Sequence, residues 1–425
     1  AYSRPNFPIN DNVIRNLFER NNGRRRTLGE VMQATKNTLS SVYKLGFCLI
    51  GDPAVKIAYP EFGMKVTTVN GQSVDGNSIS FKALEKITVE GEVLDASGQL
   101  VTDFTGIVNP TVKDSKVTVT CLKNSNKDDS PAFTFTDYPN TIFIGNDSVR
   151  NGKFSFTFTV PKDISYSNLQ GKMNLYAVDT ESGNEAQGNF DNFIVGGTSD
   201  TAEPDTIGPE IRALYLNDTT FMDGGQVNTT PYFVAELWDK SGVNITGSSV
   251  GHDMMLVIDE STVLSYNLNS YYELLLGEDG TGIVKFPIPA LEPGKHTAEF
   301  WVWDILNNST VRTFTFEVVE GLKPFLFDVI ATPGIAREQV TFHLMHNRPE
   351  SRMRVGIMVY DLAGRQLWKH EESGTSGLFE NYTVSWDLSS GGARMRPGVY
   401  IYRAAISTDN SKDATKARKF IILGE

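Results

Sequence analysis

Residues 359–365 read Val-Tyr-Asp-Leu-Ala-Gly-Arg, and residues 397–403 read Pro-Gly-Val-Tyr-Ile-Tyr-Arg. The first stretch is an apolar run that breaks at Asp361 and turns at Gly364, where glycine supplies the positive φ that a tight hairpin needs. The second stretch follows a Pro-Gly turn and consists of β-branched and aromatic residues, which are typical of a half-buried strand. Together they predict neighbouring strands of a β-sheet near the C-terminus.

Two further stretches extend this sheet. Residues 382–388 alternate between apolar and polar side chains, so one face of the predicted strand is apolar. The last strand is predicted over 417–423, where Phe420 and Ile422 share one side and Ile421 and Leu423 share the other. By themselves these patterns also fit an ordinary terminal β-sandwich.

The combination is more specific. It resembles the C-terminal sorting domain of type IX secretion cargo, an Ig-like sandwich with an Asp-Leu-x-Gly-Arg hairpin, a Gly-x-Tyr-x-Tyr-Arg strand and a basic, apolar last strand. The family usually opens with an Asn-Pro turn, whereas residues 331–334 here read Ala-Thr-Pro-Gly. The resemblance implies that residues 324–425 form a sorting-type β-sandwich that docks on PorV, an outer-membrane β-barrel.

Composition narrows the possible classes of protein. A chain of 425 residues exceeds one ordinary core, so two to four domains are expected. The formal net charge of −12 argues against nucleic-acid binding, which requires a basic surface. No apolar run is long enough for a transmembrane helix. The opening residues 1–5 lack the pattern of a signal peptide, and so abrupt a start is expected of a fragment. Cys48 and Cys121 do not form a disulfide framework.

Residues 1–60 differ from the rest of the chain. A helix capped at Asn10-Asp11 is predicted through Arg20, and a second helix is predicted from a capping box at 27–30 through Thr38 or beyond. A short buried strand is predicted over 45–50. Two helices and one strand are too few for an α/β domain, so this segment is predicted to be the tail of a larger one.

The same segment carries a second resemblance. The run Thr-Leu-Gly-Glu at 27–30, followed by Ala34, Lys36 and Asn37 and then by Ile-Gly-Asp-Pro at 50–53, is similar to the C-terminal end of the gingipain-type cysteine peptidase domain. The resemblance implies that residues 1–60 end a caspase-like domain. It also implies that the catalytic cysteine and histidine lie upstream of Ala1.

The middle of the chain is predicted to be mainly β. Short alternating strands separated by turns such as Asn70-Gly71 and Asn151-Gly152 predict a β-sandwich over 61–200. A polar linker with Pro204 and Pro209 follows, and an Ig-like sandwich is predicted over 208–321. Four short pieces of this region resemble the sortases of the type IX secretion system, a branch of the gingipain-type family: residues 205–209, 239–244, 251–253 and 303–309.

Candidate catalytic residues are few. Cys48 lies in an apolar run and is predicted to be a small core residue rather than a nucleophile. The five histidines all fall in the β regions, so no catalytic pair is assigned in this chain: His252, His296, His343, His346 and His370. On a strand, residues three apart face opposite sides, so His343 and His346 are not expected to share a metal. His252 beside Asp253 suits a hydrogen-bonded loop pair.

Loop carboxylates and amides leave a calcium site open. Asp304 with Asn307 and Asn308, or Asp239 with Asn244, offer oxygen ligands, although turn-forming residues of this kind are the commoner explanation. No metal and no cofactor is therefore assigned. The basic cluster Lys412, Lys416, Arg418 and Lys419 is predicted to be a solvated strand edge, and contact with anionic lipopolysaccharide is the alternative.

The resemblances together imply a function. The chain is expected to be the C-terminal portion of a cell-surface sortase on the outer membrane of a Gram-negative bacterium. The whole enzyme would remove sorting domains from cargo and attach the cargo to anionic lipopolysaccharide through a thioester on the upstream cysteine. Its expected partners are the upstream catalytic part, cargo sorting domains and PorV. A non-enzymatic surface adhesin with a sorting domain remains the alternative, and residues 1–60 discriminate between the two.

Overall fold

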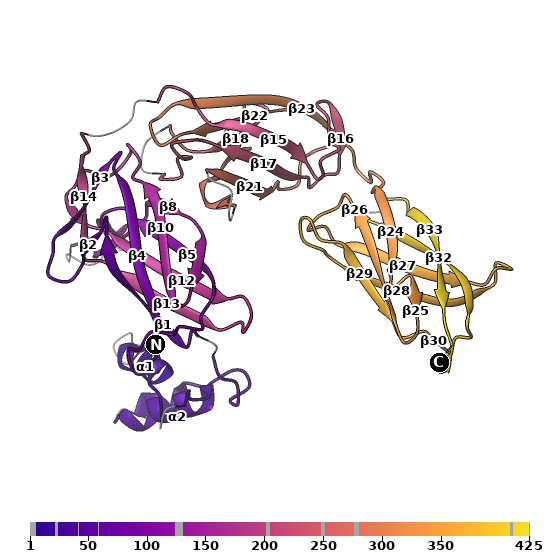
Figure 1. The fold of residues 1–425 in the computed structure, drawn as a ribbon, viewed down its shortest axis with the longest axis horizontal. Coiled ribbons are helices and arrows are strands. Elements are labelled where there is room, and N and C mark those ends of the chain that lie inside the picture. Colours follow the sequence, from indigo (N-terminus) through magenta and orange to yellow (C-terminus); the bar gives the residue numbers. More distant parts are fainter. Residues whose placement is uncertain are drawn as a thin grey trace.

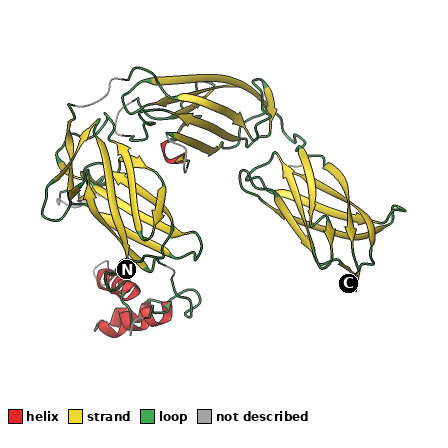
Figure 2. Cartoon of the chain, viewed as in Figure 1, coloured by secondary structure: helices red, strands yellow, loops and turns green. Residues whose placement is uncertain are grey.

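The chain folds into one helical segment and three β modules (Figures 1 and 2). In this computed structural model the described residues are 6–21, 24–40, 42–57, 59–123, 131–200, 205–247, 251–275, 280–408 and 411–424. The helices lie at one end of module 1 (residues 62–198), and module 2 (210–318) joins it to module 3 (326–422). The expected mainly β fold is confirmed, while residues 201–204 of the expected linker lie outside the described residues.

The helical segment contains α1 (Asn6–Phe18), α2 (Leu28–Thr38) and the 3-10 helix η1 (Val42–Gly46). The capping box of α2 is confirmed, because Thr27 accepts from the Glu30 N–H and the Glu30 carboxylate accepts from the Thr27 N–H. The predicted start of the first helix is wrong, because α1 begins at Asn6, before Asn10-Asp11, and ends at Phe18. α1 therefore contains the residues that were expected to cap it.

The predicted buried strand over 45–50 is also wrong. Residues up to Gly46 belong to η1, and the following residues have no regular structure. Leu45 is 72% exposed and Ile50 is 96% exposed. A lone apolar run becomes a buried strand only when neighbouring strands satisfy its backbone groups, and none of the described residues supplies them here.

Module 1 is built around a sheet that closes on itself. β12 pairs with both β13 and β5, so the pairing runs in a ring through β13, β1, β4, β10, β9 and β5. β2 and β8 attach to this ring, β11, β14 and β3 form a second sheet, and β6 and β7 form a separate ribbon. The strands are β1 (Phe62–Val69), β2 (Gln72–Ser73), β3 (Ile79–Ala83), β4 (Lys86–Leu94), β5 (Gly106–Lys113), β6 (Val117–Thr120), β7 (Thr134–Asp137), β8 (Thr141–Ile144), β9 (Asp147–Arg150), β10 (Lys153–Thr159), β11 (Leu169–Gln170), β12 (Lys172–Asp179), β13 (Glu185–Phe190) and β14 (Phe193–Thr198).

Module 2 is a sandwich of two sheets, β15-β17-β21-β20 and β16-β23-β22-β18-β19. Phe233 and Phe300 belong to the different sheets and pack 5.0 Å apart between ring centres in its core. Its elements are β15 (Glu210–Leu216), β16 (Gly225–Val227), β17 (Tyr232–Trp238), β18 (Met255–Ile258), β19 (Ser265–Asn267), η2 (Asn269–Tyr271), β20 (Tyr272–Leu274), β21 (Thr281–Pro287), β22 (Gly294–Trp303) and β23 (Ser309–Val318).

Module 3 is a sandwich of the sheets β24-β26-β29 and β25-β33-β32-β27-β28, with β30 and β31 as a small extra pair. Buried Arg348 donates to the carbonyls of Leu322 and Lys323, which ties the short linker from module 2 to this module. Its strands are β24 (Leu326–Thr332), β25 (Ile335–Ala336), β26 (Val340–His346), β27 (Met353–Tyr360), β28 (Gln366–Gly374), β29 (Tyr382–Trp386), β30 (Ser389–Ser390), β31 (Ala393–Arg394), β32 (Gly398–Ser407) and β33 (Ala414–Ile422).

Among the described residues, no helix has both the length and the apolar character that crossing a membrane requires.

Candidate functional site

Cys48 is exposed, so its predicted place in a core is wrong. The run around it does not become a strand, and its side chain therefore has no core to enter. The five histidines lie in modules 2 and 3, whereas Cys48 lies in the helical segment beyond module 1 (Figure 1). Among the described residues, Cys48 and the histidines therefore lie in different parts of the molecule.

His252 takes part in the joint between modules 1 and 2. Its Nδ1 lies 2.6 Å from Oδ2 of Asp163, and its ring packs 4.5 Å from that of Trp303. Asn307 donates to the other oxygen of Asp163 at 2.9 Å. The expected pairing with Asp253 is not formed, because Asp253 accepts from Asn269 instead. The role of Asp163 could not be predicted from the sequence, because this residue lies in module 1, far along the chain from His252 and Asn307.

Three carboxylates meet at one end of module 2. Oxygen atoms of Asp205, Asp239 and Asp304 lie within 4.8 Å of one another, and the last two side chains are buried. Burial, with added repulsion from the neighbouring carboxylates, raises the pKa of Asp239 to about 6. Burial also raises the pKa of Asp304. Asp239 and Asp304 were named in the sequence as oxygen donors, and the fold adds Asp205.

Each carboxylate of this acidic cluster also closes a loop. Asp239 accepts the N–H groups of Ser241 and Gly242, and Asp304 accepts those of Leu306 and Asn308. Carboxylate oxygens at this spacing suit a hard cation such as Ca²⁺. Their hydrogen bonds to loop N–H groups already account for the positions of these carboxylates. We therefore interpret the cluster as part of the loop structure and assign no metal to it.

His343 and His346 lie on β26, and their environments differ. His343 pairs across the ladder with Thr383, whereas His346 reaches inward to Ser376, with Nε2 and Oγ 2.9 Å apart. The Arg348 N–H donates to Nδ1 of His346, so Nε2 carries the proton in the neutral ring. Burial, together with the nearby guanidinium of Arg348, lowers the pKa of His346 to about 4. This ring is a neutral structural group at physiological pH.

The hairpin at 359–365 has the predicted conformation. Asp361 accepts the N–H groups of Ala363 and Arg365 and pairs with the Arg365 guanidinium at 2.7 Å, while Gly364 has φ of 81°. Hydrogen bonds to Arg365 lower the pKa of Asp361. The geometry of this turn therefore follows from Asp361 as acceptor and Gly364 as the residue that tolerates positive φ.

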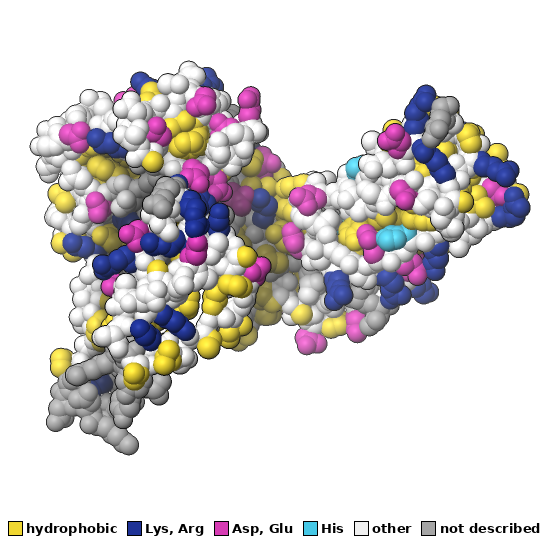
Figure 3. Space-filling view, turned by 90° about the horizontal axis from the view of Figure 1, so that it is seen from below, with side chains coloured by type: hydrophobic (Ala, Val, Ile, Leu, Met, Phe, Trp, Pro, Cys, Tyr) yellow, Lys and Arg dark blue, Asp and Glu magenta, His cyan; other side chains and the backbone are white. Residues whose placement is uncertain are grey.

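The last strand has the predicted facing. Phe420 and Ile422 are each 1% exposed, while Leu423 on the opposite side is 40% exposed. The basic cluster is only partly a solvated edge, because Lys416 donates to the Phe327 carbonyl and Arg418 pairs with Asp328 on β24 at 2.9 Å. Residues 324–425 hold 13 Lys and Arg against 11 Asp and Glu, although the whole chain is acidic. Basic side chains are visible on this module at the right of Figure 3.

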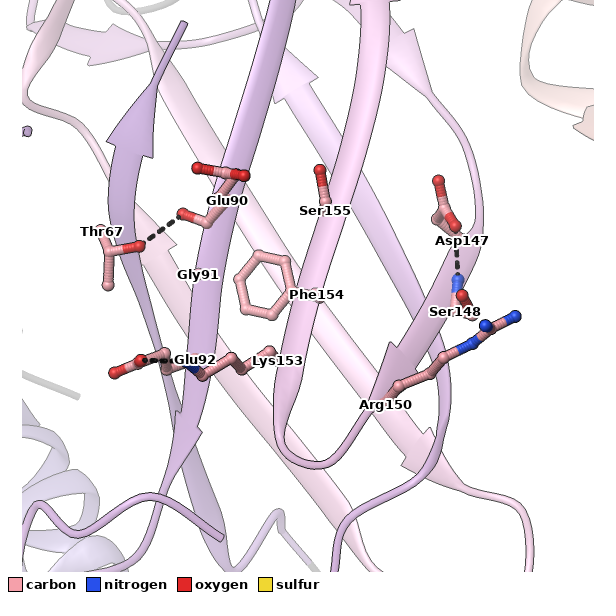
Figure 4. A pocket seen from close by; sticks show the side chains of 10 residues that line it. All are labelled: Thr67, Glu90, Gly91, Glu92, Asp147, Ser148, Arg150, Lys153, Phe154 and Ser155. Carbon is pink, nitrogen blue, oxygen red and sulfur yellow. Dashed lines mark hydrogen bonds and ion pairs between the residues drawn. The ribbon is translucent and has the colours of Figure 1, made fainter. Parts of the chain in front are cut away.

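A shallow hollow of about 540 Å³ lies on the outside of module 1 (Figure 4). Gly91 and Phe154 lie side by side within it, and a Cβ on Gly91 would come 2.2 Å from the Phe154 ring. The Phe154 ring is 3% exposed and belongs to the core of module 1, whereas the charged side chains of the hollow lie on the outer face, including Lys153, which pairs with Glu92 at 3.8 Å. The hollow has no cluster of catalytic side chains, and glycine is required there by the ring beside it.

Comparison with known proteins shows what this chain is similar to. The family model for Peptidase family C25 matches residues 1–58. The chain is 36% identical to PorU from Porphyromonas gingivalis in the crystal structure of its dimeric latent form, covering 97% of this chain and 39% of that one, with a TM-score of 0.41. No curated protein matches the chain.

More distant structures also match. A tetra-tandem repeat from the extending region of a large adhesion protein is 14% identical, covers 86% of this chain and 74% of that one, and gives a TM-score of 0.18. The Ig1-2 module of the Drosophila receptor protein tyrosine phosphatase DLAR is 10% identical, covers 52% of this chain and 100% of that one, and gives a TM-score of 0.21.

Proposed function

The chain belongs to the gingipain-type peptidase family C25 and corresponds to the C-terminal portion of a PorU-like protein, and from this we propose that it serves a cell-surface sortase. The whole enzyme removes C-terminal sorting domains from type IX secretion cargo and joins the cargo to anionic lipopolysaccharide. The observation that carries the proposal is the 36% identity over 97% of the chain. The chain spans 39% of the PorU chain it matches, so the activity of the whole protein is part of the proposal.

In this proposal the helical segment completes the catalytic domain. Its exposed apolar side chains include Phe7 at 73% and Val42 at 74% exposure, and they would pack against the body of that domain. The nucleophilic cysteine and its histidine would lie in that body. Purified chain of these 425 residues should therefore leave a peptide that spans a cargo sorting-domain junction uncut. Cleavage that disappears on Cys48→Ala would contradict this assignment.

Module 3 would hold the enzyme at the outer membrane of a Gram-negative cell by docking on PorV. β33 pairs with β32 over nine residue pairs and buries Phe420 and Ile422, so its removal opens both a ladder and the core. The alternative of a non-enzymatic adhesin is disfavoured by the match of residues 1–58 to a peptidase family.

The test is deletion of Phe420–Glu425 in the complete protein, expressed in cells that contain PorV. Modules 1 and 2 should stay folded, while the protein is lost from the outer-membrane fraction and cargo keeps its sorting domain. Leu423→Ala is the matched control, because that side chain is 40% exposed and lies outside the core. If the truncated protein still co-purifies with PorV and stays on the surface, docking by module 3 is wrong.

A further inference from the structure

The ring of strands in module 1 closes through β9 and β10, but these strands pair over a short distance only. We call the line between β10 and the β8–β9 segment the seam. β10 pairs with β4 along its whole length, but on its other edge it pairs with β9 only at Lys153 and Phe154. β8 continues the line of β9 along β5, and it pairs with β5 alone. Among the described residues, no strand fills the space between β8 and the rest of β10. Figure 4 shows the start of the seam, with Ser155 on one side and Ser148 on the other.

Beyond its pairing with β9, the edge of β10 that faces the seam has no backbone partner among the described residues. The Val160 N–H donates to the Glu85 carbonyl and the Val93 N–H donates to the Gly152 carbonyl, so the even-numbered residues of β10 bond to β4. In an antiparallel ladder, alternate residues direct their N–H and C=O groups to opposite edges. The odd-numbered residues therefore direct theirs away from β4. Ser155 still bonds to β9, because the Phe154–Val149 pair lies between two hydrogen-bonded pairs of that ladder. Thr157 and Thr159 direct theirs into the seam, where no described residue bonds to them.

A cleft of about 490 Å³ follows the seam. Residues 142–147 and 156–159 form its sides, and the rings of Phe143 and Phe158, stacked 4.7 Å apart, line it between them. Module 2 forms the other half of the lining with residues 239–243, 245, 272, 274, 275, 280 and 305, and the Leu274 carbonyl accepts from the Asn146 side chain at 2.6 Å. The buried Oδ1 of Asn146, a residue that also lines the cleft, has no hydrogen-bond donor among the described residues.

We propose that this cleft binds an extended peptide of another protein, which adds as a strand between β8 and β10. The complement of a row of alternating N–H and C=O groups at strand spacing is another peptide backbone, and strand addition is an established mode of recognition. The span from Thr157 to Thr159 is roughly 7 Å at about 3.3 Å per residue, which suits a segment of about three residues. The phenylalanine rings favour apolar side chains at alternate positions of that segment.

The buried Asn146 oxygen adds a specific acceptor for a peptide N–H or a side-chain donor. A buried acceptor without a donor is costly, and an occupant that supplies one recovers that cost. A small apolar ligand would leave both this oxygen and the edge of β10 unpaired. The inference is independent of the proposed sortase role, because it rests on module 1 and its junction with module 2 alone.

The test uses the full chain and a random heptapeptide library displayed on phage. Thr157→Pro removes an N–H that points into the seam, and proline is tolerated where the N–H faces away from the ladder. Thr157→Ala is the matched control, since it keeps the N–H and removes the γ-methyl group and the hydroxyl, which contacts the Thr88 hydroxyl. Peptides selected on the unaltered chain should show alternating apolar residues, bind Thr157→Ala equally, and bind Thr157→Pro at least roughly tenfold more weakly.

Hydrogen exchange on the unaltered chain provides a second measurement if Thr157→Pro fails to fold. The amides of Thr157 and Thr159 should exchange rapidly in the free chain and become protected when a selected peptide is added. Protection in the free chain, or protection that appears only as the chain concentration rises, would mean that the seam is covered by the chain itself or by a second copy. Either result, or a selection without any Thr157→Pro-sensitive peptide, overturns the proposal.

Discussion

The helical segment and module 3 stand at opposite ends of the chain and differ in how much apolar surface they bury. In the described part of the helical segment, Ile9 and Val31 are the buried apolar residues, while Phe7, Phe18 and Leu45 are more than half exposed. Module 3 has a continuous core contributed by both of its sheets. Helices and a capping box can thus form without a hydrophobic core. What distinguishes an independent domain from a fragment of a domain is a hydrophobic core of its own.

The helical segment is held by polar contacts instead. Arg25 pairs with Glu61 at 2.5 Å and stacks on the Tyr59 ring, and Asn16 donates to buried Thr35 at 3.2 Å. Exposed ion pairs contribute little stability, whereas burial of a large apolar side chain contributes about 1.5–3 kcal/mol. We therefore expect the segment to depend on module 1 and on further packing partners for its fold.

The largest expected effect comes from isolating the two regions. A peptide of residues 1–60 should show no cooperative thermal transition, because ordering each residue costs roughly 1–2 kcal/mol and little apolar burial offsets it. Residues 324–425 should melt cooperatively. Circular dichroism and calorimetry on both fragments measure this. A cooperative melt of residues 1–60 would remove the basis of the comparison.

A matched pair of phenylalanine substitutions tests the same contrast inside the full chain. Phe420 is 1% exposed in module 3, and Phe7 is 73% exposed in the helical segment. Phe420→Ala should lower the free energy of unfolding of module 3 by about 3–5 kcal/mol, whereas Phe7→Ala should change stability by less than about 0.5 kcal/mol. Denaturant titration gives both values. Equal effects would show that burial does not distinguish the two regions.

His346 makes the stability of module 3 depend on pH. Its folded pKa of about 4 lies below the ordinary value of 6.5, so the full stability is present above pH 6.5 and is lost as the pH falls toward 4. Between pH 7.5 and 5 the free energy of unfolding should fall by about 1–2 kcal/mol. His346→Gln should flatten this slope, while a substitution of the more exposed His370 should leave it in place. An unchanged slope in His346→Gln would exclude this origin.

The smallest effect is expected from the best-defined polar contact of the helical segment. Hydrogen bonds from Arg24 and from the Thr27 backbone lower the pKa of Glu30 to about 2, yet the Arg24 side chain is 51% exposed. Glu30→Gln should speed hydrogen exchange of the backbone amide of residue 30 by less than about fivefold, because exposed ion pairs add little stability. Thr27→Ala, which removes the cap itself, should have the larger effect. A larger effect of Glu30→Gln than of Thr27→Ala would show that the Arg24–Glu30 ion pair contributes substantially to the stability of the helix.

Features that depend on neighbours in the chain could be predicted from the sequence. The capping box at Thr27 and Glu30, the turn at Asp361 and Gly364, and the facing of Phe420 and Ile422 all follow from spacings of a few residues. The run at 45–50 was misjudged because an apolar pattern does not reveal whether a sheet exists to receive it.

Contacts between distant residues required the tertiary structure. Sequence alone named Asp239 and Asp304 but not the approach of Asp205, and it did not pair His252 with Asp163 across 89 positions. The seam beside β10 is of the same kind, since a sequence shows that a strand forms but not which of its two edges finds a partner. Backbone groups are the same in every residue except proline, so their pairing is decided by the packing of whole modules and not by side-chain pattern.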